Sequence, residues 1–158
     1  MKWFLLVWQR FAEFGGRSRR LEYWMFVLFY WIILLVLGLG VVGFPLIGQS
    51  ELGAFCTFIG AAYGLVALVP GLSCAVRRLH DTGKSGWWIL LVLVPIGVAP
   101  LFGYAVFTHG PMMEWWVPLG FALIAALVLA VLLALDGTAG PNRYGPDPKA
   151  RELPAAIG

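Results

Sequence analysis

Four long apolar stretches without a charged side chain constrain this chain more than any other feature of its sequence. They run over about residues 23–44, 52–76, 87–107 and 115–135, and none of them contains Asp, Glu, Lys or Arg. A helix needs about 20 apolar residues to cross the hydrocarbon core of a bilayer. The sequence therefore predicts an all-α fold, an integral membrane four-helix bundle in a single membrane domain.

The composition of the 158 residues excludes a soluble alternative. Hydrophobic residues make up 61% of the chain and charged residues 12%, whereas a soluble domain carries about 25% charged residues. So few polar side chains cannot cover the surface of a small soluble monomer. A soluble enzyme, a disordered chain and a nucleic-acid-binding domain are excluded on this ground, and no nucleic acid partner is expected.

The basic residues predict one orientation in the membrane. They lie before the first span, between the second and third, and after the fourth: Lys2, Arg10, Arg17, Arg19, Arg20, Arg77, Arg78, Lys84, Arg143, Lys149 and Arg151. The two remaining loops contain no Lys or Arg. Because positive charge is retained in the cytoplasm, both termini are predicted to be cytoplasmic.

The polar segments outside the spans each have a distinct character. Residues 2–14 predict an interfacial amphipathic helix, ended by Gly15 and Gly16. Residues 77–86 predict a polar cytoplasmic loop. Residues 137–158 form a tail whose Gly and Pro content predicts turns at the cytoplasmic surface.

Three of these segments carry long motifs. They read FGGRSRRLEYW over residues 14–24, RRLHDTGKSGWW over residues 77–88, and GTAGPNRYGPDP over residues 137–148. Their order and spacing resemble the bacterial inner-membrane proteins of the domain-of-unknown-function 805 family. The resemblance implies a small four-helix protein of the bacterial inner membrane with its motifs on the cytoplasmic side. It implies no reaction.

The cytoplasmic motifs predict a surface that binds an anionic lipid headgroup or a membrane-protein partner. Helix N-termini beside arginines attract phosphate, and basic pockets on the cytoplasmic side of a membrane protein bind lipid headgroups. The candidate residues are Arg17, Arg19, Arg20, Arg77, Arg78, His80, Asp81, Lys84, Trp87, Trp88, Asn142, Arg143 and Tyr144. The alternative is that the arginines only set the topology, with Asp81 paired to Arg78 or Arg143.

Two further functions stay open at this stage. An oligomer could form a small-molecule transporter or channel, although the spans contain no ionisable group to mark a path. A lipid-modifying enzyme could use His80 and Asp81, although adjacent residues on a helix point about 100° apart. We expect no catalytic residue, cofactor or metal ion, because His80, His109, Cys56 and Cys74 lack ligand spacing.

A pair of glycines in the second span predicts close helix packing. Gly60 and Gly64 form a Gly-x-x-x-Gly motif, which lets two helices approach each other closely. The partner helix is either another helix of the same chain or the same helix of a second copy. The second alternative predicts a homo-oligomer.

Overall fold

The computed structural model describes residues 1–94 and 116–149, and within these ranges the regular structure is helical. Helix α1 (Lys2–Gln9) precedes two long helices, α2 (Arg20–Leu46) and α3 (Ser50–Asp81). A 3-10 turn, η1 (Gly86–Ile89), leads into α-helix over residues 90–94, and α5 spans Trp116–Ala134. Most of the third predicted span lies outside the described residues. In the described part, α2 and α3 are long and apolar enough to cross a membrane.

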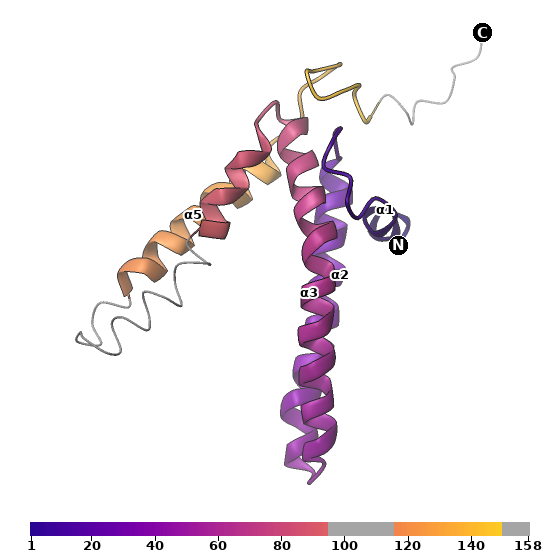
Figure 1. Cartoon of the computed structure of the whole chain (residues 1–158), viewed down its shortest axis with the longest axis vertical. Coiled ribbons are helices and arrows are strands. Elements are labelled where there is room, and N and C mark those ends of the chain that lie inside the picture. Colours follow the sequence, from indigo (N-terminus) through magenta and orange to yellow (C-terminus); the bar gives the residue numbers. More distant parts are fainter. Residues whose placement is uncertain (95–115, 150–158) are drawn as a thin grey trace.

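Helices α2 and α3 form an antiparallel hairpin (Figure 1). A glycine in the left-handed region follows each helix: Gly48 has φ +78° and Gly83 has φ +73°. After α3, the amide of Gly83 donates to the carbonyl of His80, and the amide of Lys84 donates to that of Leu79. This Schellman arrangement satisfies carbonyls that the helix end would leave without a partner.

Helix α3 is longer than its apolar stretch, which corrects one prediction. The segment 77–86 was expected to be a loop, but α3 continues to Asp81. Only residues 82–85 connect it to η1. The helix continues through Arg77 and Arg78 because their charges meet carboxylates and carbonyls of the protein and do not need solvation by water.

Glycines set the close approach of α2 and α3. A Cβ on Gly40 would lie 2.7 Å from Cys56 Sγ, and one on Gly53 would lie 2.9 Å from Pro45 Cγ. A Cβ on Gly60 would lie 3.9 Å from Leu37 of α2, and one on Gly64 would lie 3.9 Å from the hydroxyl of Tyr30. The small-residue face of α3 is therefore used inside the hairpin.

Helix α1 lies across α2 and α3, and it is shorter than predicted. It ends at Gln9, whereas residues 2–14 were expected to be helical. Its Val7 is fully buried, and Phe4 and Trp8 contact Phe26 of α2. The chain leaves the helix at Arg10, whose guanidinium turns back to bind Glu13. The amide of Glu13 also donates to the carbonyl of Arg10 over 3.2 Å, so the chain makes a turn here.

Helix α5 and residues 86–94 form a second arm that diverges from the hairpin (Figure 1). The arm meets α3 through a small apolar cluster of Ala75, Leu79, Leu129 and Leu133. Away from this cluster the elements separate, and an apolar cavity of about 320 Å³ lies between them. The described helices thus form two pairs joined at one end.

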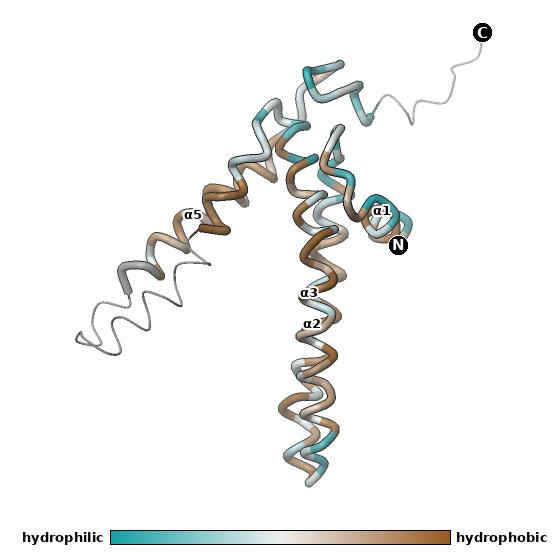
Figure 2. The backbone as a smooth tube through the Cα atoms, viewed as in Figure 1, coloured by the Kyte–Doolittle hydropathy of each residue, from teal (hydrophilic) through white to brown (hydrophobic). Residues whose placement is uncertain are grey.

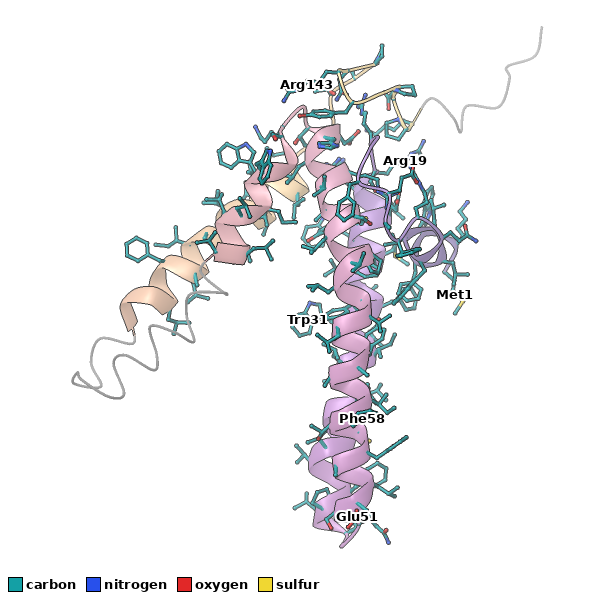
Figure 3. All side chains as sticks on the ribbon, in the orientation of Figure 1. Met1, Arg19, Trp31, Glu51, Phe58 and Arg143 are labelled. Atoms are coloured by element: carbon teal, nitrogen blue, oxygen red, sulfur yellow. The ribbon has the colours of Figure 1, made fainter. Side chains whose placement is uncertain are left out.

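The polar residues concentrate at the end where the two pairs join. Figure 2 shows hydrophobic backbone along the middle of the hairpin and hydrophilic segments at both of its ends. Figure 3 places Arg19 and Arg143 at the joined end and Glu51 at the far tip of the hairpin. The three motifs meet at the joined end.

Candidate functional site

Asp81 is the centre of the site because it binds two arginines from different segments. The Nε of Arg17 donates to Asp81 Oδ1 over 2.9 Å, and Arg78 donates to Asp81 Oδ2. All three side chains are almost fully buried, none with more than 5% of its surface exposed. Asp81 paired with Arg78 was one of the two pairings expected from the sequence, and it is confirmed. The partner Arg17 was not foreseen.

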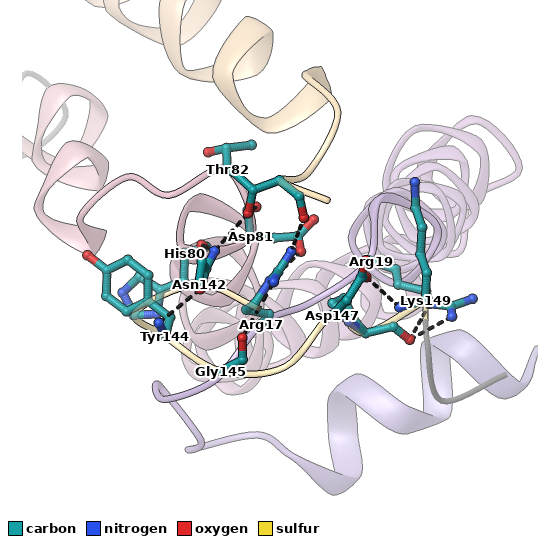
Figure 4. A network of polar contacts seen from close by, with 12 residues as sticks. Arg17, Arg19, His80, Asp81, Thr82, Asn142, Tyr144, Gly145, Asp147 and Lys149 are labelled. Carbon is teal, nitrogen blue, oxygen red and sulfur yellow. Dashed lines mark hydrogen bonds and ion pairs between the residues drawn. The ribbon is translucent and has the colours of Figure 1, made fainter. Parts of the chain in front are cut away.

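The remaining donors of these two arginines bind main-chain carbonyls. Arg17 donates to the carbonyls of Gly140 and Thr138 in the tail, each over 2.6 Å (Figure 4). Arg78 donates from Nε to the carbonyl of Leu133 over 3.0 Å, and also to that of Leu135. Cations at the end of a helix stabilise its unpaired carbonyls. The two arginines therefore join α3, α5 and the tail.

Gly137 allows the tail to cross directly over Asp81. A Cβ at this position would overlap the Oδ2 atom of Asp81, closer than two non-bonded heavy atoms can approach. The amide of the next residue, Thr138, donates to the carbonyl of Asp81 over 2.8 Å. Only glycine leaves room for this contact.

The tail also covers the last turn of α3. Asn142 Nδ2 donates to the carbonyl of His80 over 2.9 Å, and Arg143 donates to the carbonyl of Gly83 over 3.2 Å. The ring of Tyr144 stacks on His80, with 3.8 Å between centroids and 4° between planes. Arg143 thus binds the carbonyl of Gly83. Its pairing with Asp81, the second one expected from the sequence, is not formed.

A second buried ion pair lies one turn deeper. Arg77 is fully buried, and its Nη2 lies 3.4 Å from Oε1 of Glu22, whose side chain is 4% exposed. The carbonyl of Arg77 also accepts the amide of Ser18 over 3.1 Å. Arg77 thus holds the segment before α2 against α3.

A pocket of about 450 Å³, which we call the cation pocket, lies beside the cluster around Asp81 and shares Arg78 and Asp81 with it. Its lining residues are Arg19, Arg20, Leu21, Arg78, Asp81, Gly137, Pro148 and Lys149. Arg19 binds the carbonyl of Pro148 through Nε over 2.9 Å and through Nη2 over 2.6 Å. Arg20 pairs with Asp136 over 2.5 Å, and both side chains are exposed, 46% and 69%.

Asp147 stabilises the tail beside this pocket. Its carboxylate accepts the amide of Lys149 over 2.8 Å and that of Gly140 over 3.2 Å. The hydrogen bond from Lys149, followed by that from Gly140, holds the pKa of Asp147 below its usual value. The carboxylate therefore stays charged and keeps the tail folded over the pocket.

The thirteen residues predicted to form one binding surface lie in the three motifs that meet at the joined end, but their surroundings differ. Arg17, Arg77 and Arg78 are buried and bind protein groups, while Arg19 and Arg20 line the cation pocket. His80, Asn142, Arg143 and Tyr144 join the tail to α3. Lys84 lies in the connection after α3, and Trp87 and Trp88 are exposed on η1, 76% and 45%.

The geometry around His80 is that of a packed side chain. Its Nδ1 lies 3.3 Å from the carbonyl of Gly16, and its ring face is covered by Tyr144. Ser85, which would be the nearest nucleophile for the enzyme alternative, accepts the amide of Trp87 and caps η1. Within the described residues, no group of three His, Cys, Asp or Glu side chains is placed to hold a metal ion.

Sequence reasoning missed four residues that the site needs. They are Glu22, Ser18, Gly137 and Thr138. Glu22 had a readable signal, because it is an acidic residue at the start of an apolar span that follows three arginines. Gly137 had none, because its role depends on a contact across 56 residues of sequence.

These features define a class, namely a small helical membrane protein whose polar motifs are folded together at one end of its helices. The chain belongs to the family described as protein of unknown function DUF805, whose model matches residues 11–146. This confirms the resemblance stated from the three motifs.

Two relatives in Escherichia coli strain K12 carry names that place them in the inner membrane. Inner membrane protein YhaI is 35% identical over 149 residues, which cover 94% of this chain and 97% of the relative. Inner membrane protein YhaH is 34% identical over 151 residues, covering 94% and 98%. Uncharacterized protein YiiR of the same strain is 32% identical over 148 residues, covering 90% of each. No solved structure matches this chain.

Proposed function

We propose that this chain is a multi-pass protein of the bacterial inner membrane whose cation pocket binds the headgroup of an anionic phospholipid. The chain crosses the membrane four times, and both termini are cytoplasmic. The protein has no catalytic role in this proposal. The names of YhaI and YhaH and the placement of the basic residues support the location.

The observation that carries the proposal is the charge of the cation pocket. Four cations line it, and Asp81 is the one carboxylate among its lining residues. Arg20 and Lys149 are exposed there, and a phosphate would compete with the exposed Asp136 for Arg20. A phosphate diester carries the negative charge and the acceptor oxygens that such a pocket recognises.

Burial narrows the set of residues that can test this proposal. Arg17, Arg77 and Arg78 are buried in ion pairs, so replacing them would test folding and not ligand binding. Arg20 and Lys149 lie at the pocket and are exposed. Their replacement removes charge from the pocket and leaves the buried pairs intact.

The experiment is native mass spectrometry of protein released from nanodiscs that contain equal amounts of phosphatidylglycerol and phosphatidylcholine. We expect the wild-type protein to retain phosphatidylglycerol preferentially. The double variant Arg20→Gln/Lys149→Gln should retain about thirtyfold less, because each of the two charge-assisted contacts contributes about 1 kcal/mol near a membrane surface.

The matched control is Lys2→Gln/Lys84→Gln, which removes the same charge from positions outside the pocket. It should retain phosphatidylglycerol like the wild type. Equal losses in both double variants would mean that net charge alone attracts the lipid, and they would contradict a defined pocket. A wild-type protein released without lipid would contradict the lipid site and favour a protein partner.

A further inference from the structure

The apolar cavity between the hairpin and the second arm begins along helix α2 at Tyr23, three positions after Arg20 of the cation pocket. We call it the apolar wedge. The side chains that line it come from α2, α3, residues 89–93 and α5: Tyr23, Phe26, Val27, Tyr30, Trp31, Gly64, Ala67, Leu68, Gly71, Leu72, Ala75, Ile89, Val92, Leu93, Leu129 and Leu133. None of these side chains is charged.

One face of α2 connects the two sites. Arg20 of the cation pocket and Tyr23, Val27 and Trp31 of the wedge follow the i, i+3, i+7, i+11 spacing of a single helix face. A molecule that lies along this face meets cations first and an apolar surface afterwards. Its polar group must therefore be anionic and its remainder apolar.

The distance along α2 from the cation pocket to the far end of the wedge fits one leaflet of a membrane. Arg20 and Trp31 are 11 residues apart, which is about 16 Å along an α-helix. Half of the hydrocarbon core of a bilayer is about 15 Å thick. An acyl chain that starts at the cation pocket would end near the midplane, beside Trp31.

Small residues on α3 line the wedge opposite the larger side chains of α2. Gly64, Ala67, Gly71 and Ala75 all contribute to the wedge. The closed end is formed by Ala75 and Leu133, which are 6% and 2% exposed. The open end is formed by Trp31 and Leu68, which are 62% and 52% exposed. The wedge is thus closed where α3 meets α5 and open at the level of Trp31 and Leu68, farther along α2 from the cation pocket.

We infer that the wedge binds an acyl chain of the same anionic phospholipid whose headgroup occupies the cation pocket. This inference rests on the proposed function, and it adds that the ligand is recognised at both ends. The site takes a long-chain phospholipid of the cytoplasmic leaflet and holds it between α2 and α5. The charge of the pocket and the leaflet-length apolar face together favour a lipid over a second copy of the chain.

The test fills the wedge without changing the cation pocket. Leu68→Trp adds bulk at the open end of the wedge. Leu28→Trp is the matched control, since Leu28 is also half exposed, at 51%, but lies outside the wedge. Both proteins are loaded with dioleoyl-phosphatidylglycerol in nanodiscs, or with dihexanoyl-phosphatidylglycerol in detergent, and measured by native mass spectrometry.

We expect Leu68→Trp to retain about fivefold less of the long-chain lipid, which corresponds to about 1 kcal/mol. It should bind the short-chain lipid like the wild type. Leu28→Trp should match the wild type with both lipids. If Leu68→Trp loses helical content by circular dichroism, Val92→Trp fills the wedge from the opposite wall and replaces it.

Different results overturn the two proposals. Equal retention of the long-chain lipid by both Trp variants would reject the acyl-chain site and leave the headgroup site standing. Failure of the wild type to bind either lipid would reject the headgroup site as well. A lipid-free dimer that Leu68→Trp converts to monomer would assign the wedge to a second copy of the chain and overturn the inference.

Discussion

At the scale of single residues, burial separates the arginines into two groups with different tasks. Arg17 and Arg78 lose their water and in return bind Asp81 and four carbonyls. Arg20 keeps nearly half of its surface in solvent and pairs with an exposed carboxylate. A buried ion contributes to structure only while its partners are present, whereas an exposed one remains available to a ligand.

The first prediction concerns Asp81→Asn. The substitution removes the one negative charge between two buried guanidinium groups. We expect the free energy of unfolding to fall by about 3–5 kcal/mol, the usual cost of leaving a buried charge without its partner. Unfolding in mixed micelles with increasing dodecyl sulfate, followed by circular dichroism, measures this loss.

The control for that measurement is Asp136→Asn, which breaks the exposed pair with Arg20. This substitution should lower the free energy of unfolding by less than about 1 kcal/mol, because solvent and salt weaken exposed ion pairs. A similar loss in both variants would show that Asp81 is not the structural centre of the site.

At the scale of elements, the tail stabilises the end of helix α3 that it covers. Thr138 and Asn142 bind the carbonyls at the end of α3, and Arg17 binds two carbonyls of the tail. Helix α3 therefore extends to Asp81, beyond its apolar stretch. The sequence pattern predicted a loop there because it takes account of hydropathy and not of partners.

Gly137→Ala tests the contact between the tail and α3. The added Cβ would overlap Asp81 Oδ2, so the tail must move away from the helix. We expect the free energy of unfolding to fall by about 1–3 kcal/mol, the usual cost of overpacking. We also expect faster amide exchange at Thr138, whose amide donates to Asp81. Unfolding in dodecyl sulfate measures the loss of stability, and hydrogen–deuterium exchange followed by mass spectrometry measures the exchange rate.

Gly120→Ala is the comparison for this prediction. Gly120 lies within α5, and among the residues that the structure describes no atom beyond its own helical turns would meet its Cβ within 4 Å. Alanine has the higher helix propensity, so stability should be equal or slightly greater. If Gly137→Ala behaves in the same way, the tail does not pack on Asp81 as described.

At the scale of the whole molecule, charge and apolar length are arranged along one axis. The basic motifs gather at the end where the hairpin meets the second arm, and Glu51 lies at the opposite tip (Figure 3). With the topology proposed from the positive-inside rule, we expect the joined end to lie in the cytoplasm. The cation pocket and the open wedge face the inner leaflet in this orientation.

Cysteine labelling tests this orientation. In a background with Cys56→Ala and Cys74→Ala, we expect Glu51→Cys to react with a membrane-impermeant maleimide in cells whose outer membrane has been opened. Ala139→Cys, on the exposed part of the tail, should react only after the inner membrane is disrupted. The reverse pattern would place the cation pocket outside the cytoplasm.

The sequence by itself determined the class of this protein and the position of two long helices along the chain. Apolar runs of this length are stable as helices in the hydrocarbon core of a membrane. Two such runs predicted spans that lie close to α2 and α3. Glycines and prolines after Leu135 predicted the turns of the tail, which the structure confirms over residues 137–149. These properties depend on neighbours in the sequence, so local pattern is enough to read them.

Only the tertiary structure decided what the charged residues do. Arg17 and Arg20 lie three positions apart in one motif, yet the first is buried against Asp81 and the second is exposed at the cation pocket. The difference depends on contacts with α3, α5 and the tail, which lie far away in the sequence. Charge alone does not reveal such partners, because the free energy of a buried ion depends on the atoms around it as well as on its own charge.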